Sequence, residues 1–486
     1  MELCVFTREI KRETIMKNYL YNKILIVMLC CYVGAIFSSC SNDITVATID
    51  EDNYITSKTP QAYVLNQEGK RLTSLVEFRE EGNSSIYVHL DKAAKVDVSA
   101  EIAYNAELLT EYNEQNESNY ELFPEELVSI ENDGKVTITK GEKQSSAGVV
   151  TFSSSDALET DKTYVIPVSA KVNSADAEIS DGVSKHFIFV KDFSKIPSTD
   201  KGTGVKIVSC MEVNDTNPLN NLSFYMKNSG KPLVDIVILF SANINYDAEK
   251  GRVYVYQNPE VTTLLANREK YIKPLQDAGM KVVLGILGNH DRAAVTNLAD
   301  DTARDFAVEL KAVLDAYKLD GVFWDDEYSK PMSPPPAGFV RPGQGTDRLI
   351  YETKRLMPDK LNIVYVYGGT RSLDSVVDEE GNVIQPGEYI DGALHDYGGY
   401  WDLSSSYEGL PKSGMGLHSQ KFNSAVMASE YDLRNMRERG YGLNMIFAMD
   451  PFRWNVYEQI SQMEMMARVL FDDELEVREF YEADHK

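Results

Sequence analysis

Residues 205–478 alternate short, strongly apolar segments with segments of helical periodicity, and this alternation restricts the possible folds more than any other feature of the chain. Every position of Val237–Phe240 is apolar, as in a strand that is buried on both faces. A repeated strand–helix order of this length is typical of an α/β fold of the (β/α)8, or TIM, barrel type. An open doubly wound sheet is the alternative, but no glycine-rich phosphate loop follows the first apolar segment.

The same pattern predicts where the elements of the barrel lie. The expected strands are 205–213, 235–243, 281–287, 319–328, 362–367, 389–395, 414–418 and 443–449. The expected helices are 260–278, 302–317, 347–356, 422–439 and 456–471. Pro274 should kink the first of these helices, because proline has no backbone N–H to donate.

The fourth expected strand, Leu319–Tyr328, ends in three acidic residues. Because side chains alternate along a strand, Phe323, Asp325 and Glu327 are expected on one face and Trp324 on the other. Asp325 and Glu327 would then lie about 6.7 Å apart along the backbone. Two carboxyl groups this close resist joint ionisation, so one should keep its proton near neutral pH, as glycosidic-bond cleavage requires. The alternative is a strand end with solvated acids.

This stretch resembles the signature Asp-Gly-x-Asp-x-Asp-x-Glu of glycoside hydrolase family 18. The matching positions are Asp320, Gly321, Asp325 and Glu327. The run Asp325–Tyr328 is most similar to endo-β-N-acetylglucosaminidases of the Endo H type. Further likeness lies in Phe240–Asp247 and Leu287–His290. One motif aspartate is replaced by Phe323, which puts full activity in doubt because the charge that would shift the pKa of Asp325 is missing.

The resemblance implies roles for individual residues. Glu327 would protonate the leaving oxygen and later activate water, while Asp325 would hold the substrate's acetamide N–H. Tyr397 would orient the acetamide carbonyl, with a packing tyrosine as the alternative. Four polar residues at or near strand ends are candidates for substrate binding, although structural roles explain them equally well: Asn243, Asn289, His290 and Asp450. Trp324 is expected in the core.

The front of the chain has the features of an export signal. Residues 24–37 are apolar but fall short of the roughly 20 residues of a membrane helix. Phe37–Cys40 resembles a bacterial lipobox, so residues 1–39 are predicted to be a lipoprotein-type signal peptide and Cys40 the lipidated residue. The expected location is the outer membrane or cell surface, with a membrane partner reached through the lipid. An ordinary signal peptide with an incidental cysteine is the alternative.

Between this signal and the barrel, residues 40–60 read as a polar tether and residues 61–194 as an antiparallel β-sandwich domain. Its strands are expected at 62–65, 75–78, 86–90, 96–103, 136–139, 148–152, 164–170 and 186–190, with one short helix at 106–112. Residues 195–204 form the linker. The domain resembles sandwich modules of glycan-utilisation lipoproteins, and a spacer role is favoured over carbohydrate binding.

Charge and composition exclude several function classes. A net charge of −26 disfavours nucleic acid and anionic membrane surfaces as partners. Cys210 is the one cysteine beyond Cys40, so no disulfide framework is expected. No Cys/His spacing of a metal site occurs, and neither a metal nor a cofactor is predicted.

These features together predict an endo-β-N-acetylglucosaminidase that hydrolyses the GlcNAc-β1,4-GlcNAc core of N-linked glycans by substrate-assisted, retaining catalysis. The alternatives are a chitinase and a catalytically inactive glycan-binding surface lipoprotein. Too few residues separate His418 from Leu443 for the wall domain of polymer-gripping chitinases, so that side of the cleft should be open. The proline-rich loop Lys330–Gly345 is expected to form a rim against a branched glycan.

Overall fold

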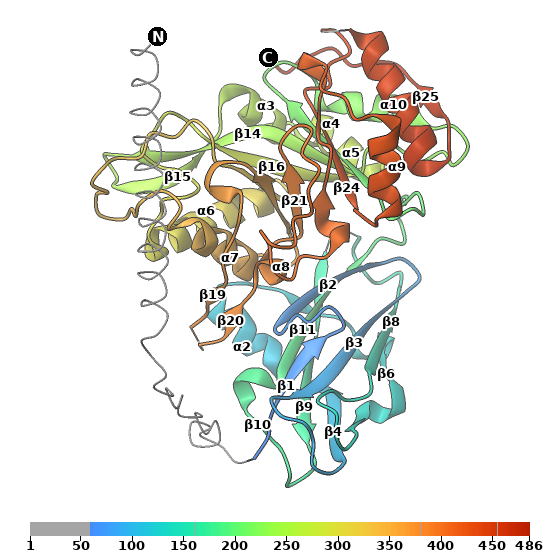
Figure 1. Cartoon of the computed structure of the whole chain (residues 1–486), viewed down its shortest axis with the longest axis vertical. Coiled ribbons are helices and arrows are strands. Elements are labelled where there is room, and N and C mark those ends of the chain that lie inside the picture. Colours follow the sequence, from blue (N-terminus) through green and yellow to red (C-terminus); the bar gives the residue numbers. More distant parts are fainter. Residues whose placement is uncertain (1–58, 161, 380, 454) are drawn as a thin grey trace, which may run out of the picture. The chain divides into compact units, whose positions relative to one another are not determined.

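The computed structural model describes residues 59–486, apart from 161, 380 and 454 (Figure 1). Residues 59–486 form one compact unit. The predicted signal peptide, most of the tether and Cys40 lie outside the described residues, so those predictions stay predictions. Within the described part of the chain, no helix is long and apolar enough to cross a membrane.

The amino-terminal part of this unit consists of two β-sheets. One sheet has the order β10-β1-β3-β8-β6 and the other β2-β11-β9-β4-β7, with β5 beside β9. Their bounds are β1 Gln61–Asn66, β2 Thr73–Phe78, β3 Glu81–Leu90, β4 Val98–Tyr104, β5 Glu121–Leu122, β6 Val128–Ile130, β7 Lys135–Ile138, β8 Gly148–Ser153, β9 Thr163–Val172, β10 Glu178–Ile179 and β11 Lys185–Asp192. All eight strands expected from the sequence are present. The fourth begins later than expected, because Val96 is 43% exposed and precedes β4.

Alternation along the strands gives this part its core. In β1 every second side chain is buried, and in β4 Val98, Ala100 and Ile102 turn inward. The buried faces of both sheets meet in one cluster around Phe78, Phe123 and Phe152, whose rings contact edge to face. The helix α2 (Glu107–Gln115) covers the other face of the second sheet, where Leu109 and Tyr112 pack on Phe187 and Phe189. One sandwich core and one helix-covered face therefore account for its apolar residues.

The carboxy-terminal part is a closed barrel of eight parallel strands. The barrel order is β12-β14-β16-β17-β18-β21-β22-β24, and β24 pairs back to β12. The strands are β12 Lys206–Glu212, β14 Ile236–Asp247, β16 Lys281–Gly288, β17 Gly321–Asp325, β18 Leu361–Val366, β21 Gly392–His395, β22 Met415–Gly416 and β24 Leu443–Phe447. The expected eight-stranded barrel is confirmed. A hairpin partner of β14, β15 (Arg252–Tyr256), was not foreseen.

Two of the expected helices differ in the structure. The segment 260–278 is not one kinked helix but three short ones, because Asn267 leaves helical geometry and Pro274 opens a new helix. The segment 422–439 is helical only from residue 430, because Ala425 adopts a left-handed conformation and Ser429 caps a new start with Asp432. No α-helix joins β12 to β14 or β21 to β22 in the described residues. The helices are α3 Pro259–Ala266, α4 Arg268–Tyr271, α5 Lys273–Asp277, α6 Asp300–Ala316, α7 Thr346–Leu356, α8 Pro386–Tyr389, α9 Glu430–Glu438 and α10 Val456–Phe471.

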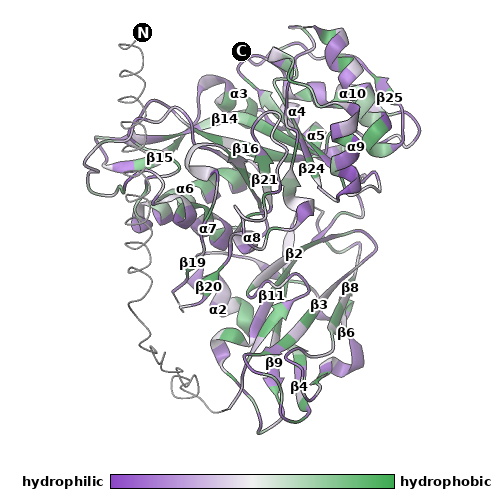
Figure 2. Cartoon of the chain, in the orientation of Figure 1, coloured by the Kyte–Doolittle hydropathy of each residue, from purple (hydrophilic) through white to green (hydrophobic). Residues whose placement is uncertain are grey.

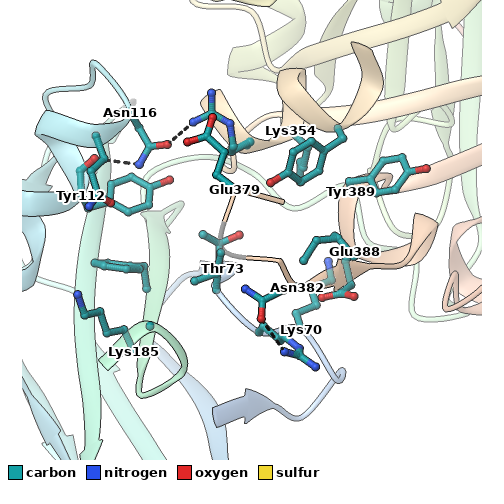
Figure 3. Close-up of a pocket in the computed structure, with 18 of the residues that line it drawn as sticks. Lys70, Thr73, Tyr112, Asn116, Lys185, Lys354, Glu379, Asn382, Glu388 and Tyr389 are labelled. Atoms are coloured by element: carbon teal, nitrogen blue, oxygen red, sulfur yellow. Dashed lines mark hydrogen bonds between the residues drawn. The ribbon is translucent and has the colours of Figure 1, made fainter. Parts of the chain in front are cut away.

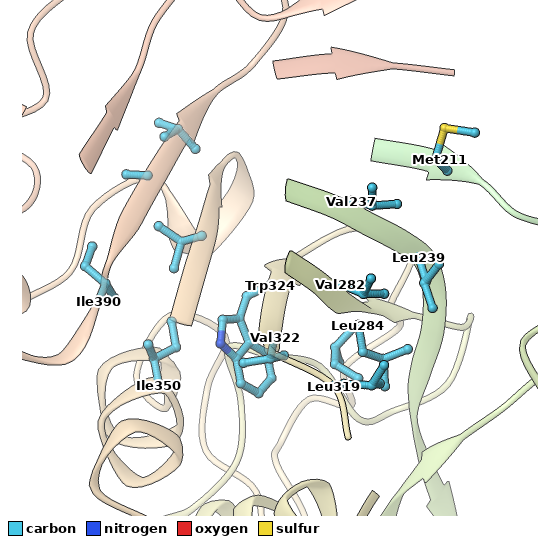
Figure 4. Close-up of a cluster of buried hydrophobic side chains, with 14 of the residues drawn as sticks. Met211, Val237, Leu239, Val282, Leu284, Leu319, Val322, Trp324, Ile350 and Ile390 are labelled. Carbon is cyan, nitrogen blue, oxygen red and sulfur yellow. The ribbon is translucent and has the colours of Figure 1, made fainter. Parts of the chain in front are cut away.

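The two faces of the barrel strands are buried in different apolar regions, one between the strands and the helices and one inside the barrel. Along β17, Val322 and Trp324 face the helices, where Trp324 is fully buried and donates its indole N–H to Asn362 (Figure 4). Phe323 faces the barrel interior with residues such as Ile238 and Leu394. The predicted core position of Trp324 is thus confirmed. Figure 2 shows the resulting pattern, with apolar strands inside and polar surfaces on outer helices such as α9.

The buried carboxylate of Asp359, just before β18, joins the sandwich to the barrel. It accepts hydrogen bonds from the hydroxyls of Tyr120 and Thr163, each at 2.8 Å, and lies 3.3 Å from the ammonium of Lys191. Burial alone would raise the pKa of Asp359, but Lys191, Lys360 and these hydroxyls hold the pKa well below its usual range. Asp359 is therefore ionised and tied to three sandwich side chains.

We expect Asp359→Ala to lower the free energy of unfolding by about 3 kcal/mol or more, because it leaves the ammonium of Lys191 buried without its counter-ion. Urea unfolding would measure the loss. The matched control is Asp277→Ala, which breaks the exposed Lys273–Asp277 pair and should change stability by less than about 1 kcal/mol. Equal effects of the two substitutions would contradict the role given to Asp359.

Candidate active site

The predicted catalytic carboxyl groups lie at the carboxyl ends of the barrel strands. Asp325 is the last residue of β17, and Glu327 lies in the loop that follows, so the expectation of one strand through Glu327 is wrong. The loop is held against the end of β16 by a hydrogen bond of 2.8 Å from the backbone N–H of His290 to the carbonyl of Tyr328. A Cβ at Gly288 would lie 2.2 Å from the carbonyl oxygen of Glu327, so this close approach requires glycine.

Asp325 is buried, with 5% of its surface exposed, and its Oδ1 atom has no hydrogen-bond partner among the described residues. Burial, followed by the nearby carboxyl groups of Glu327, Asp326 and Asp396, raises the pKa of Asp325 to about 8. No cation offsets these effects at Asp325. The group therefore keeps its proton near neutral pH.

Glu327 is half-buried, and burial is the largest cause that raises its pKa. A hydrogen bond with Tyr328 and the charge of Lys421 act in the opposite direction, while Asp396 and Asp326 raise the pKa further. The charge of Glu327 contributes to the raised pKa of Asp325, so the two groups titrate as a coupled pair. Both carboxyl groups therefore have pKa values above their ordinary values.

Tyr397, which follows β21, lies beside this pair. Its ring is 6.1 Å from that of Tyr365 and 5.7 Å from that of Phe447, and Lys421 places its ammonium 4.9 Å from the ring centre. Burial raises the pKa of the Tyr397 hydroxyl, and the carboxyl group of Asp325 acts in the same direction. The structure thus brings Asp325, Glu327 and Tyr397 together at the carboxyl end of the barrel strands.

The four candidate binding residues occupy different surroundings. Asn243 on β14 donates weakly to the carbonyls of Leu287 and Gly288, at 3.3 and 3.4 Å, at the level of Asp325 in the barrel. Asn289 and His290 follow β16, and the exposed His290 ring lies 5.8 Å from that of Tyr328.

Asp450 has a structural part to play. It follows β24, is buried, and accepts the backbone N–H groups of Phe452 and Arg453 at 2.9 and 3.2 Å. These bonds stabilise the turn that follows β24, which is a structural role rather than a contact with substrate. Its Oδ2 atom has no hydrogen-bond partner among the described residues.

Two charged residues at the mouth of the barrel were missed. Asp396 accepts a hydrogen bond of 2.5 Å from the hydroxyl of Tyr365 and one of 2.7 Å from the backbone N–H of Tyr397. The charge of Lys421 acts to lower the pKa of both Glu327 and Glu212. The inward position of Leu394 on β21 places residue 396 inward by alternation, so the strand pattern held a signal for Asp396. Lys421 lies on β23 (Gln420–Lys421), between the strand expected at 414–418 and the helix expected at 422–439, and had no such signal.

Phe323 occupies the barrel floor below these groups. It is 1% exposed and lies between the rings of Phe240 and Tyr365, at 6.3 and 6.1 Å. Phe323 therefore forms part of an apolar layer inside the barrel, next to the end of β17 that carries Asp325. Among the described residues, no group of three or more His, Cys, Asp or Glu side chains is arranged to hold a metal ion.

Comparison with known proteins identifies the family. A family model described as an N-terminal domain matches residues 52–177. Endo-β-N-acetylglucosaminidase F1 of Elizabethkingia meningoseptica is 55% identical over 273 residues, which cover 56% of this chain and 79% of the relative. An endo-β-N-acetylglucosaminidase of Flavobacterium sp. (strain SK1022) is 31% identical over 253 residues, which cover 51% of this chain and 77% of the relative.

Solved structures of Bacteroides thetaiotamicron EndoBT-3987 match both parts of the chain. The structure with a Man5GlcNAc product has a TM-score of 0.79 at 34% identity, and covers 87% of this chain and 97% of that one. The structure with a Man9GlcNAc2Asn substrate has a TM-score of 0.72 at 32% identity with the same coverage. On the identity and coverage of its curated relatives, the chain belongs to the endo-β-N-acetylglucosaminidase family.

Proposed function

We propose that this enzyme hydrolyses the β1,4 bond between the two core N-acetylglucosamines of N-linked glycans and leaves one sugar on asparagine. The observation that carries the proposal is the pair of Asp325 and Glu327, both with raised pKa values, at the mouth of a barrel whose relatives are endo-β-N-acetylglucosaminidases. The substrate class is supported by EndoBT-3987, which was solved with Man9GlcNAc2Asn and with Man5GlcNAc.

The proposed mechanism is the substrate-assisted, retaining route of glycoside hydrolase family 18. The acetamide oxygen of the substrate attacks the anomeric carbon while Glu327 gives its proton to the leaving oxygen. This breaks the glycosidic bond and forms an oxazolinium-like intermediate. Glu327, now a carboxylate, removes a proton from water, which attacks the anomeric carbon and reopens the ring with overall retention.

The other two residues act on the acetamide group. Asp325 accepts its N–H and stabilises the positive intermediate, which requires a carboxylate at Asp325 and the proton on Glu327. Because the two groups share one proton, substrate binding only has to move that proton within the pair. Tyr397 donates its hydroxyl toward the acetamide carbonyl and fixes its direction. Asn243, Asn289 and His290 line the approach in this proposal.

A branched substrate fits the segment between the last two barrel strands. In the described residues from Leu417 to Gly442 there are only β23, a 3-10 turn and α9, so no wall domain is inserted. The proline-rich loop Lys330–Gly345 contains no helix or strand and follows Glu327 directly. We therefore place the glycan arms against this loop, and expect poor activity on crystalline chitin.

Glu327→Gln should reduce release of N-glycans at least about 100-fold while retaining glycan binding, since it removes the proton donor but keeps the side-chain shape. Mass detection of glycans released from glycoproteins of defined glycan type measures this loss. The conservative control Glu309→Gln changes a carboxylate on the outer helix α6 and should leave release unchanged. Full release by Glu327→Gln, or rapid chitin hydrolysis by the wild type without release from glycoproteins, would overturn the assignment.

The pH dependence of kcat/KM should change when the charge of Asp396 is removed. Activity needs the shared proton, so kcat/KM should fall as pH rises through about 8, where Asp325 titrates. Asp396 raises the pKa of both Asp325 and Glu327, so Asp396→Asn should move this alkaline limb to lower pH by about half a unit to one unit. Asparagine retains an oxygen that can accept from Tyr365 and Tyr397.

The control for this experiment is Asp300→Asn at the exposed start of α6, which should leave the profile in place. An alkaline limb that does not move in Asp396→Asn would show that Asp396 does not tune the pair.

We also propose that the enzyme is an exported bacterial lipoprotein with its anchor at Cys40, on the strength of the apolar run at 24–37 and the lipobox-like Phe37–Cys40. Cys40→Ser should give unprocessed or soluble protein instead of membrane-associated protein. Mass spectrometry of the mature amino terminus and fractionation of membranes would measure this. A wild-type protein that is lipid-free and cleaved elsewhere would refute the anchor.

A further inference from the structure

A cavity of about 540 Å³ lies between the sandwich and the barrel, apart from the catalytic residues (Figure 3). Its sandwich side is formed by α2, β2 and the start of β11. Its barrel side is formed by α7, α8 and the hairpin of β19 (Val376–Val377) and β20 (Val383–Ile384). No catalytic residue lines it. Its volume falls within the range of sites that bind small ligands, and such sites favour domain interfaces.

Two buried tyrosines line this cavity from opposite sides. Tyr112 of α2 is 8% exposed and Tyr351 of α7 is 7% exposed. Neither hydroxyl has a hydrogen-bond partner among the described residues, and no hydrogen bond contributes to the pKa of either group. In Figure 3 the hydroxyl of Tyr112 points into the cavity. Since neither hydroxyl is bonded to the protein, both are available to a ligand in the cavity.

Two hydrogen bonds cross from one part of the chain to the other at this cavity. Arg355 of α7 donates to Asn116 at the end of α2, at 2.8 Å. Arg71, just before β2, donates to Asn382 in the β19–β20 hairpin, at 3.2 Å. Both bonds appear in Figure 3. The walls of the cavity are therefore held in place, and it is a formed site rather than a gap between loosely packed surfaces.

The charges around the cavity are balanced. Lys185 pairs with Glu111 at 2.8 Å, and Arg355 pairs with the buried Glu352 at 2.8 Å. Lys354 pairs with Asp391 at 2.8 Å, and the charges of the other two basic groups, Lys70 and Arg71, act to lower the pKa of Glu388 in the same wall. A strongly anionic ligand would compete with these carboxylates. Alternating donors and acceptors beside tyrosine rings instead suit the hydroxyl groups of a neutral sugar.

We propose that this cavity is a second carbohydrate site, which takes a neutral mannose-rich oligosaccharide and contacts it through the hydroxyls of Tyr112 and Tyr351. The choice of oligosaccharide rests on the proposed function. The site gives the sandwich domain a part in glycan capture. It lies away from the barrel mouth, because the sandwich contacts the barrel at Lys281 and Asp359, which begin β16 and precede β18. These strands are the parallel neighbours of β17, and Asp325 lies at the opposite end of β17.

The test uses Man5GlcNAc and the described chain with Glu327→Gln, so that turnover plays no part in the result. Native mass spectrometry and titration calorimetry should find two bound copies per chain. Adding Tyr112→Phe and Tyr351→Phe should remove one copy, or weaken it about tenfold or more, because each substitution deletes one hydroxyl and little volume. In the wild-type background the same two substitutions should leave kcat for glycoprotein release unchanged.

The matched control is Tyr104→Phe, whose hydroxyl bonds the carbonyl of Phe123 within the sandwich, and which should retain two copies. One bound copy before and after the tyrosine substitutions would overturn the second site, as would a crystal soaked in Man5GlcNAc with only water in the cavity. These outcomes are independent of glycan release, so failure of the proposed function would be seen separately, as absent release from glycoproteins.

Discussion

The burial of Asp325 on an aromatic floor is the constraint on which the active site depends. Phe323, Tyr365 and Tyr397 surround the end of β17 and keep water from one side of the carboxyl group. The other neighbours of Asp325 are acids. Both effects favour the protonated form, and the site thereby keeps an acidic proton at a pH where a free aspartate has none. Glu327 can draw on that proton because it lies just beyond the strand.

Asp359 shows that burial alone does not decide this outcome. It is as buried as Asp325, at 6% and 5% exposed, yet the pKa values of the two groups move in opposite directions. Asp359 faces Lys191 and two hydroxyl donors, so its ionised form contributes stability above its unfolded pKa that is lost as pH falls. Asp325 has a raised pKa, so stability present below its unfolded pKa is lost as pH rises toward 8. Asp325 at the barrel mouth thus lowers the stability of the fold at neutral pH, and Asp359 at the junction raises it.

Much of this arrangement could be predicted from local patterns. Alternation placed Phe323 inside the barrel and Trp324 outside, because side-chain direction in a strand depends only on position. The end of β17 could not be predicted in the same way. It depends on the contact of the following loop with Gly288 and His290, which come from another strand. Lys421 was missed for a related reason, since it lies in a short strand, β23, that is defined by its pairing with β24. Such effects arise from tertiary contacts and single backbone conformations.

The contacts between the sandwich and the barrel could not be predicted from the sequence. Tyr112 and Tyr351 are separated by more than two hundred residues, and each reads as an ordinary apolar position of its own helix. Only the folded structure shows that both hydroxyls belong to one cavity, because the two helices form opposite walls of it. A spacer domain needs a firm attachment, which Asp359 and Lys191 already provide. It does not need a polar cavity beside that attachment, lined by two tyrosine hydroxyls that have no hydrogen-bond partner among the described residues. The cavity is therefore better explained by a ligand than by the requirements of joining two domains.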